Sequence, residues 1–94
     1  MDDVLKLPEK LDVAAARSVR DTLLSRRGTP VVIDAASVGR ASALAVEVLL
    51  SGARQWREDG QPFRVEDMSD AFLDTCHGLG IAPLALCAGP GGAR

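Results

Sequence analysis

The alternation of apolar and polar residues along this chain predicts strands and helices in turn. Val4–Leu7 is a short, mainly apolar segment ended by Pro8, which predicts a strand. From Val13 to about Arg26 the pattern changes to the three- and four-residue spacing of a helix with one buried face. The residues that define this face are Ala16, Val19 and Leu23.

Polar residues at the ends of this helix fix its limits. Asp12 precedes it, and its carboxylate is suited to accept hydrogen bonds from first-turn amides. Gly28 follows the last turn and is a typical helix stop. The next segment, Val31–Asp34, is apolar on both faces, which predicts a central strand of a buried sheet.

A second and longer helix is expected to begin after Ser42, a favourable N-cap residue, and to run to about Glu58 before Asp59-Gly60. One face of its helical wheel carries Ala45, Val48, Leu49, Gly52 and Trp56. The opposite face carries Glu47, Ser51, Arg54 and Glu58. Val46 and Leu50 fall on the flank between these faces, where they could form a contact patch or pack under a neighbouring helix.

The last part of the chain predicts one more strand and one more helix. Phe63–Val65 is expected to be a strand, and Ser69 caps a helix that stops at Gly80. Ile81–Leu86 contains Pro83, so it is at best a weak edge strand. We expect residues 1–86 to form one domain and residues 87–94 to form a flexible tail. The element order gives an α/β fold, with a small mixed β-sheet packed against α-helices.

Composition excludes several classes of protein. The 94 residues suffice for one small domain, and 47% apolar residues argue against a disordered chain. The net charge of −2 disfavours nucleic-acid binding. An acidic first segment and the lack of a long apolar run predict neither a signal peptide nor membrane insertion, so we expect a cytoplasmic protein. Cys76 and Cys87 are isolated, which favours reduced thiols there.

Three segments together carry a resemblance to a known family. They are the Leu11-Asp12 pair before the first helix, the run VVIDAASVGRASALAVEVLL, and the capped helix in SDAFLDTCHGLGI. In this order they resemble the STAS domain of anti-sigma factor antagonists and sulfate transporters, over about residues 3–82. The resemblance implies a STAS-like fold, in which the usual pair of strands before Leu11-Asp12 is here reduced to one.

The phosphorylation motif of that family is altered in this chain. Phosphorylated members open the helix with an Asp and then an acceptor Ser or Thr. Counting without gaps from Asp34 places Ser42 at the acidic position and Ala43 at the acceptor position. Alanine has no oxygen to receive a phosphoryl group. Ser42 could act as a displaced acceptor or as an N-cap, and we favour the N-cap.

A narrower resemblance fits this loss. The run VEVLLSGARQWREDG, with Arg54 and Trp56 after Leu-Leu-Ser, resembles the short STAS proteins of bacterial chemotaxis operons, which lack the acceptor motif. Those proteins are thought to bind the chemotaxis histidine kinase and to change how its response regulator is handled. The resemblance implies a non-catalytic regulator of that kind. The alternatives are a phospho-regulated anti-sigma factor antagonist and a soluble STAS subunit of a lipid-transport ATPase.

Sequence offers little for catalysis. His77 is the single histidine and lies beside a helix end, and the glycines of Gly89–Gly92 are followed by neither a helix nor a lysine. We therefore expect no catalytic residue, metal or cofactor, and the sequence leaves the oligomeric state open. Instead, the loop and one flank of the second helix predict a surface for a protein partner. Its residues are Arg40, Ser42, Ala43, Val46, Glu47, Leu50 and Arg54.

Overall fold

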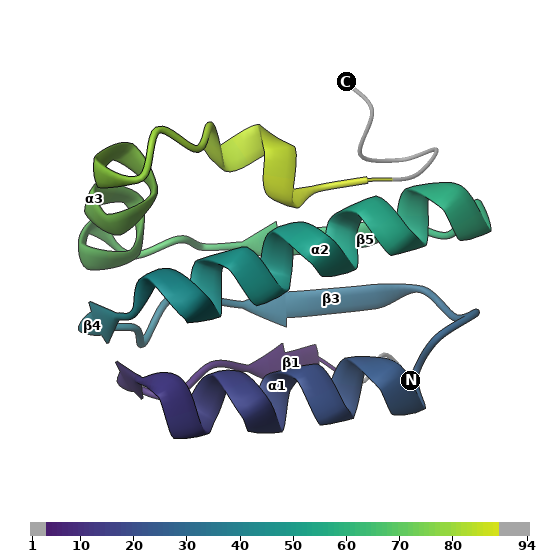
Figure 1. Ribbon diagram of the computed structural model, residues 1–94, viewed down its shortest axis with the longest axis horizontal. Coiled ribbons are helices and arrows are strands. Elements are labelled where there is room, and N and C mark those ends of the chain that lie inside the picture. Colours follow the sequence, from purple (N-terminus) through teal and green to yellow (C-terminus); the bar gives the residue numbers. More distant parts are fainter. Residues whose placement is uncertain (1–3, 89–94) are drawn as a thin grey trace.

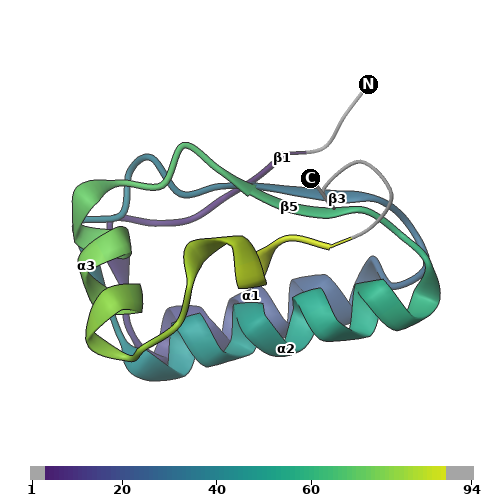
Figure 2. The same ribbon diagram turned by 90° about the horizontal axis from the view of Figure 1, so that it is seen from above.

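The computed structural model, which describes residues 4–88, alternates strands and helices in two layers (Figure 1). Its elements are β1 (Val4–Lys6), β2 (Lys10–Leu11), α1 (Val13–Ser25), β3 (Val31–Asp34), β4 (Arg40–Ala41), α2 (Ala43–Asp59), β5 (Phe63–Glu66), α3 (Asp70–Gly78) and the 3₁₀ helix η1 (Pro83–Leu86). Helices α1 and α2 lie side by side on one face of the sheet, and α3 lies at the end where α2 begins (Figures 1 and 2). No helix of the described residues covers the opposite face of the sheet (Figure 2).

The main sheet has the order β1-β3-β5 and is parallel throughout. Strand β3 is central, as its apolar residues on both faces predict. Val31 and Ile33 are buried under the helices, whereas Val32 and Asp34 are half-buried on the other face. Among the described residues the antiparallel contribution to the expected mixed sheet is an isolated bridge between Phe63 and Ala88.

The core lies between the sheet and the two long helices. Ala53 and Trp56 of α2 are buried against it, and the indole ring of Trp56 meets the ring of Phe63 edge-on, with centroids 5.5 Å apart. Gly52 lets α2 approach closely, because a Cβ there would lie 3.1 Å from a ring carbon of Phe63 and 3.2 Å from Leu23. The α/β class expected from the sequence is confirmed.

Three side chains cap the helices as predicted. Asp12, Ser42 and Ser69 each accept a hydrogen bond from the backbone N–H three residues further on. Helix α2 ends at Gly60, whose φ of 72° is favourable for glycine and costly for other residues. The helix limits therefore follow from local chemistry.

Two local expectations differ from the structure. Ile81–Leu86 is not an edge strand, because Pro83 begins the short 3₁₀ helix η1, and Leu86 at its end is wholly buried. Before the first helix there are two short strands, because Lys10–Leu11 pairs in parallel with Arg40–Ala41.

The beginning of the predicted tail is also part of the packed chain. Ala88 is buried and exchanges two backbone hydrogen bonds of 2.8 Å with Phe63. Residues 89–94, the rest of that predicted tail, lie outside the described residues.

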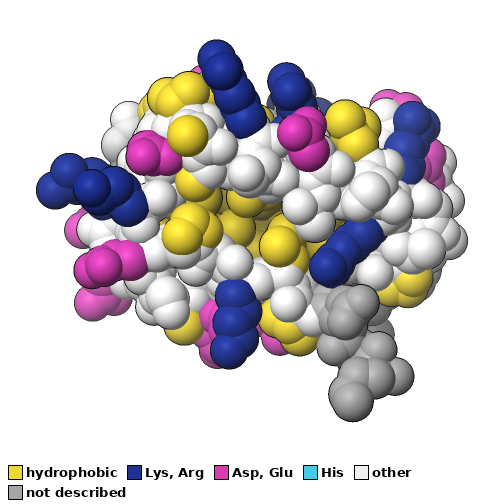
Figure 3. Space-filling view, turned by 90° about the horizontal axis from the view of Figure 1, so that it is seen from below, with side chains coloured by type: hydrophobic (Ala, Val, Ile, Leu, Met, Phe, Trp, Pro, Cys, Tyr) yellow, Lys and Arg dark blue, Asp and Glu magenta, His cyan; other side chains and the backbone are white. Residues whose placement is uncertain are grey.

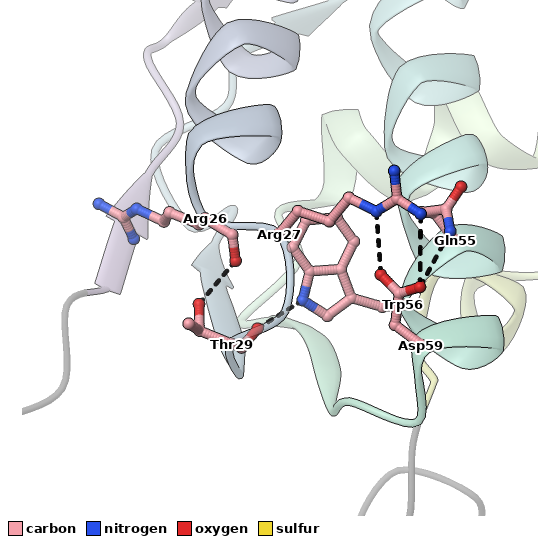
Figure 4. Close-up of polar contacts among 6 residues, drawn as sticks. All are labelled: Arg26, Arg27, Thr29, Gln55, Trp56 and Asp59. Atoms are coloured by element: carbon pink, nitrogen blue, oxygen red, sulfur yellow. Dashed lines mark hydrogen bonds and ion pairs between the residues drawn. The ribbon is translucent and has the colours of Figure 1, made fainter.

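The C-terminal ends of α1 and α2 are joined by polar contacts (Figure 4). The guanidinium of Arg27 donates to the Asp59 carboxylate at 3.1 Å, and the amide of Gln55 donates to the same carboxylate. The hydrogen bond from Arg27 holds the pKa of Asp59 below its ordinary value of 3.8. The indole N–H of Trp56 donates to the Thr29 carbonyl at 2.6 Å. These contacts fix how the two helices end beside each other.

Candidate partner-binding surface

The loop that joins β3 to α2 is anchored by two buried side chains. Ala35 is wholly buried, and Val38 is only 2% exposed. The Asp34 carboxylate accepts a hydrogen bond from the Ala36 amide at 2.9 Å, which turns the chain just after β3. The Ala35 amide donates to the Glu66 carbonyl at 3.0 Å. The loop therefore has a defined conformation.

Neighbouring segments also hold this loop from both sides. The amides of Gly39 and Arg40 both donate to the Glu9 carbonyl, at 2.9 and 3.0 Å. On the other side the Ser69 hydroxyl, which also caps α3, donates to the carbonyl of Val38. The exposed side chain of Arg40 is thus presented from a backbone that is bonded on either side of it.

The first turn of α2 follows directly. The Ser42 amide donates to the Leu11 carbonyl at 2.9 Å, and its hydroxyl oxygen accepts from the Ala45 amide at 3.1 Å. Ser42 is half-buried in this position. Ala43, at the acceptor position implied by the family resemblance, is exposed and carries no hydroxyl. The N-cap role predicted for Ser42 is confirmed.

Val46 corrects the predicted surface. Its side chain is wholly buried, so it packs in the core and does not reach a partner. Helix α3 and η1 lie on the side of α2 that faces away from α1 (Figure 1). Val48, which the helical wheel placed in the core, instead lies half-buried on the α1 side.

The other predicted residues of α2 form one ridge. Ala43, Glu47 and Arg54 are exposed, and Leu50 is half-buried against the core. Their spacings of four, three and four residues place them along one line of the helix surface. The ridge starts beside Arg40 in the sequence and runs toward the end of α2.

One apolar residue of this region escaped the sequence-based prediction. Leu44 in the first turn of α2 is 41% exposed, and it lines a groove of about 370 Å³ between α1 and α2. Leu24 of α1, 62% exposed, lies along the same groove, with Glu47 and Arg20 among the other lining residues. The sequence did indicate that this leucine could be exposed, because Leu44 falls outside the apolar face of the predicted helix.

The described residues offer little for covalent or metal chemistry. Residues 4–88 hold no group of three or more His, Cys, Asp or Glu side chains placed to bind a metal ion. Burial raises the pKa of the Cys76 thiol, which makes its reactive thiolate form scarcer. His77 is exposed in the last turn of α3. In the same part of the chain no helix is long and apolar enough to cross a membrane.

Comparison with known protein families gives a match. A family model described as "Mlab, STAS domain" matches residues 1–86, which is most of the chain. No curated protein and no solved structure matches it significantly.

Proposed function

Because this chain belongs to the STAS domain family, we propose that it is a regulatory module that binds a signalling protein without catalysing a reaction. STAS domains are generally non-catalytic regulatory domains that interact with protein partners. The partner we propose is a histidine kinase of a chemotaxis system, in the cytoplasm, and the effect is a change in how the response regulator is phosphorylated.

One observation carries the proposal. The exposed position that would receive a phosphoryl group is Ala43, and the neighbouring Ser42 oxygen already accepts the hydrogen bond that caps α2. Phosphorylation of Ser42 would engage the oxygen that caps α2 and add a charge of about −1.5 to −2 to a half-buried residue. This arrangement favours a binding surface that is always available over one that a kinase switches off.

The shape and chemistry of the α2 ridge support protein binding. Ala43 is small, so a partner backbone could approach the first turn of the helix closely. Leu50 and the nearby Leu44 provide apolar contacts, whereas Glu47 and Arg54 supply opposite charges at the rim. Protein interfaces commonly combine apolar anchors with such a polar rim.

The proposal is tested by titrating the protein into the purified chemotaxis kinase in a calorimeter. We expect saturable binding, and we expect the transfer of phosphate from kinase to response regulator to change when the protein is added. A kinase from which the response-regulator binding region has been removed serves to show which step is affected. Absence of binding and of any change in phosphate transfer would contradict the proposed partner.

A second measurement separates the proposal from a phospho-regulated antagonist. The protein is incubated with ATP and with each candidate kinase, and its intact mass is then measured. We expect no added phosphoryl group on the parent chain. If the parent chain gained one phosphoryl group and the Ser42→Ala variant did not, Ser42 would be a phosphate acceptor. That result would contradict a binding surface that is always available.

A further inference from the structure

Strand β1 leaves one edge of the main sheet open. It pairs only with β3, and no strand of the described residues lies on its other side. The Leu7 amide, directly after β1, donates to the Asp34 carbonyl of β3 at 2.9 Å. Because backbone groups alternate in direction along a strand, those of Leu5 also face β3, and those of Val4 and Lys6 face outward. The open edge therefore offers the N–H and C=O groups of both residues.

An apolar hollow lies next to this edge. Seen from below Figure 1, hydrophobic side chains gather in a recess near the middle of the surface (Figure 3). A cavity of about 230 Å³ lies there between β1 and α1. It is lined by Leu5, Lys6, Pro8, Ala15, Ser18, Val19 and Thr22. Of the four α1 residues in this lining, Ala15 and Ser18 are small.

We propose that a second copy of this chain occupies the edge, with the two β1 strands antiparallel about a twofold axis through Leu5. Val4 of each copy then lies opposite Lys6 of the other, and each pair exchanges two backbone hydrogen bonds. Leu5 faces Leu5 in a non-hydrogen-bonded pair, in which side chains are closest. These two leucines cover the hollows of both copies, so the interface is the same patch used twice.

The chemistry of the strand selects this register. A shift that sets Lys6 opposite Lys6 brings like charges together and faces Val4 with Pro8, which has no N–H to donate. A shift by one residue sets the outward-facing N–H and C=O groups of one strand opposite a residue whose groups face β3, so hydrogen bonds between the copies are lost. In the proposed register each Lys6 side chain instead lies beside an exposed Val4, which its aliphatic stem can cover.

The opposite edge of the sheet explains why pairing stops at two copies. There the backbone of Phe63 is already engaged by Ala88. Pairing through β1 alone gives one continuous sheet across two molecules, and among the described residues its two outer edges, at β5 of each copy, are partly covered by Ala88. The expected assembly is a closed dimer.

The test removes one outward N–H and nothing that faces β3. In Lys6→Pro the bonds between β1 and β3 are kept, because proline is tolerated where an edge-strand amide faces outward. The matched control Lys6→Val also removes the charge but retains the N–H. By sedimentation from micromolar to millimolar concentration, we expect the parent to dimerise and Lys6→Pro to dissociate at least about tenfold more readily. Lys6→Val should dimerise at least as tightly as the parent.

Monomers at every concentration of the parent would overturn the proposal and leave the edge to a strand from another protein. A Lys6→Pro dimer as tight as the parent would overturn it as well.

Cross-linking decides the matter if Lys6→Pro fails to fold. Facing residues of a non-hydrogen-bonded antiparallel pair lie close enough for a disulfide. In a Cys87→Ser background, with Cys76 buried, we expect Leu5→Cys to form a disulfide dimer under mild oxidation much faster than the exposed control Ser25→Cys. Equal rates for the two variants would contradict pairing through β1.

Discussion

At the scale of single residues, Ser42 and Ala43 determine how α2 begins and what its first turn offers a partner. The Ser42 oxygen satisfies the Ala45 amide, one of the donors that a helix start leaves without a partner inside the helix. Ala43 then provides a small, uncharged surface. Helix α2 thus begins at a side chain engaged in capping and presents a residue without a hydroxyl in its first turn.

We expect Ser42→Ala to lower the free energy of unfolding by about 1 kcal/mol, because the cap is lost. Ser42→Asp should retain stability, since aspartate also caps and its charge suits the positive end of the helix. Urea unfolding measures both. Ser51→Ala, at an exposed serine within α2, is the control and should cost nothing. Equal effects of Ser42→Ala and Ser51→Ala would refute the structural role.

Of the two roles that the sequence left open for Val46, a contact patch or packing under a neighbouring element, the structure supports packing. Because its side chain is wholly buried, Val46→Asp should place an unpaired carboxylate in the core and destabilise the domain by more than about 3 kcal/mol. Thermal unfolding should show this, whereas Glu47→Gln at the adjacent exposed site should change stability by less than about 0.5 kcal/mol. A folded Val46→Asp variant of parental stability would return Val46 to the surface.

The burial of Val46 and the partial exposure of Val48 show what residue patterns could not predict. The helical wheel placed Val48 on the apolar face and Val46 on its flank, yet Val46 is the more deeply buried of the two. Their burial depends on the elements packed on each side, and η1 could not be foreseen as a helix from a segment resembling a weak strand. The predicted surface therefore included one core residue, Val46, and left out the exposed Leu44.

At the scale of elements, the close approach of α2 to the sheet rests on Gly52. Alanine would favour the helix by up to about 1 kcal/mol, yet its Cβ would meet two packed core side chains, Phe63 and Leu23, at 3.1 to 3.2 Å. We expect overpacking to prevail and Gly52→Ala to lower the free energy of unfolding by about 1 kcal/mol. In Gly78→Ala nothing lies within 4 Å of the added Cβ, so stability should be unchanged or higher. Denaturant unfolding compares them, and a gain in both would contradict the tight contact.

The link between the ends of α1 and α2 predicts a dependence on pH. The hydrogen bond from Arg27 lowers the pKa of Asp59 in the folded state, so its stabilising effect is present above the ordinary value of 3.8. It is lost as pH falls through the lower folded-state pKa. The stability difference between the parent and Asp59→Asn should thus be largest near neutral pH and vanish in acid.

Thermal unfolding across pH tests this, at low salt because the pair is partly exposed. Asp21→Asn is the control. Its carboxylate lies 3.6 Å from Arg20 and is 71% exposed, so we expect little effect. A difference for Asp59→Asn that persisted unchanged in acid would exclude the Arg27 contact as its cause.

Most elements follow from short-range chemistry, and the exceptions follow from long-range pairing. Strand β3 and the three capped helices begin and end close to the predicted residues, because apolar runs, cap side chains and glycines act locally. The pairing of β2 with β4 joins segments about thirty residues apart through only two residues each. Such short strands carry no periodicity to detect, so they appear only when the whole chain is folded.

At the scale of the whole molecule, the two long helices start at the same end as the anchored loop and α3 (Figure 1). The starts of α1 and α2, the loop before α2, and α3 are thus neighbours at this end. Backbone hydrogen bonds of Arg40 and Ser42 join the loop and the start of α2 to the segment that leads into α1. A partner that binds there meets a preformed surface and loses little affinity to ordering it. The proposed dimer edge at β1 lies on a separate face, so one contact need not exclude the other (Figures 1 and 3).

The two helix starts at this end provide a matched test of the partner surface. Neither α1 nor α2 has an acidic residue in its first turn, and each has an exposed alanine there, Ala14 and Ala43. Glutamate at either position should leave stability unchanged or raise it by a few tenths of a kcal/mol, because its charge suits the positive helix end.

Only Ala43→Glu puts bulk and charge on the α2 ridge. We expect it to weaken kinase binding in a calorimetric titration by at least about tenfold, with Ala14→Glu binding like the parent. Equal affinity of both variants would move the interface off the ridge, since the two changes add the same side chain to the first turn of a helix.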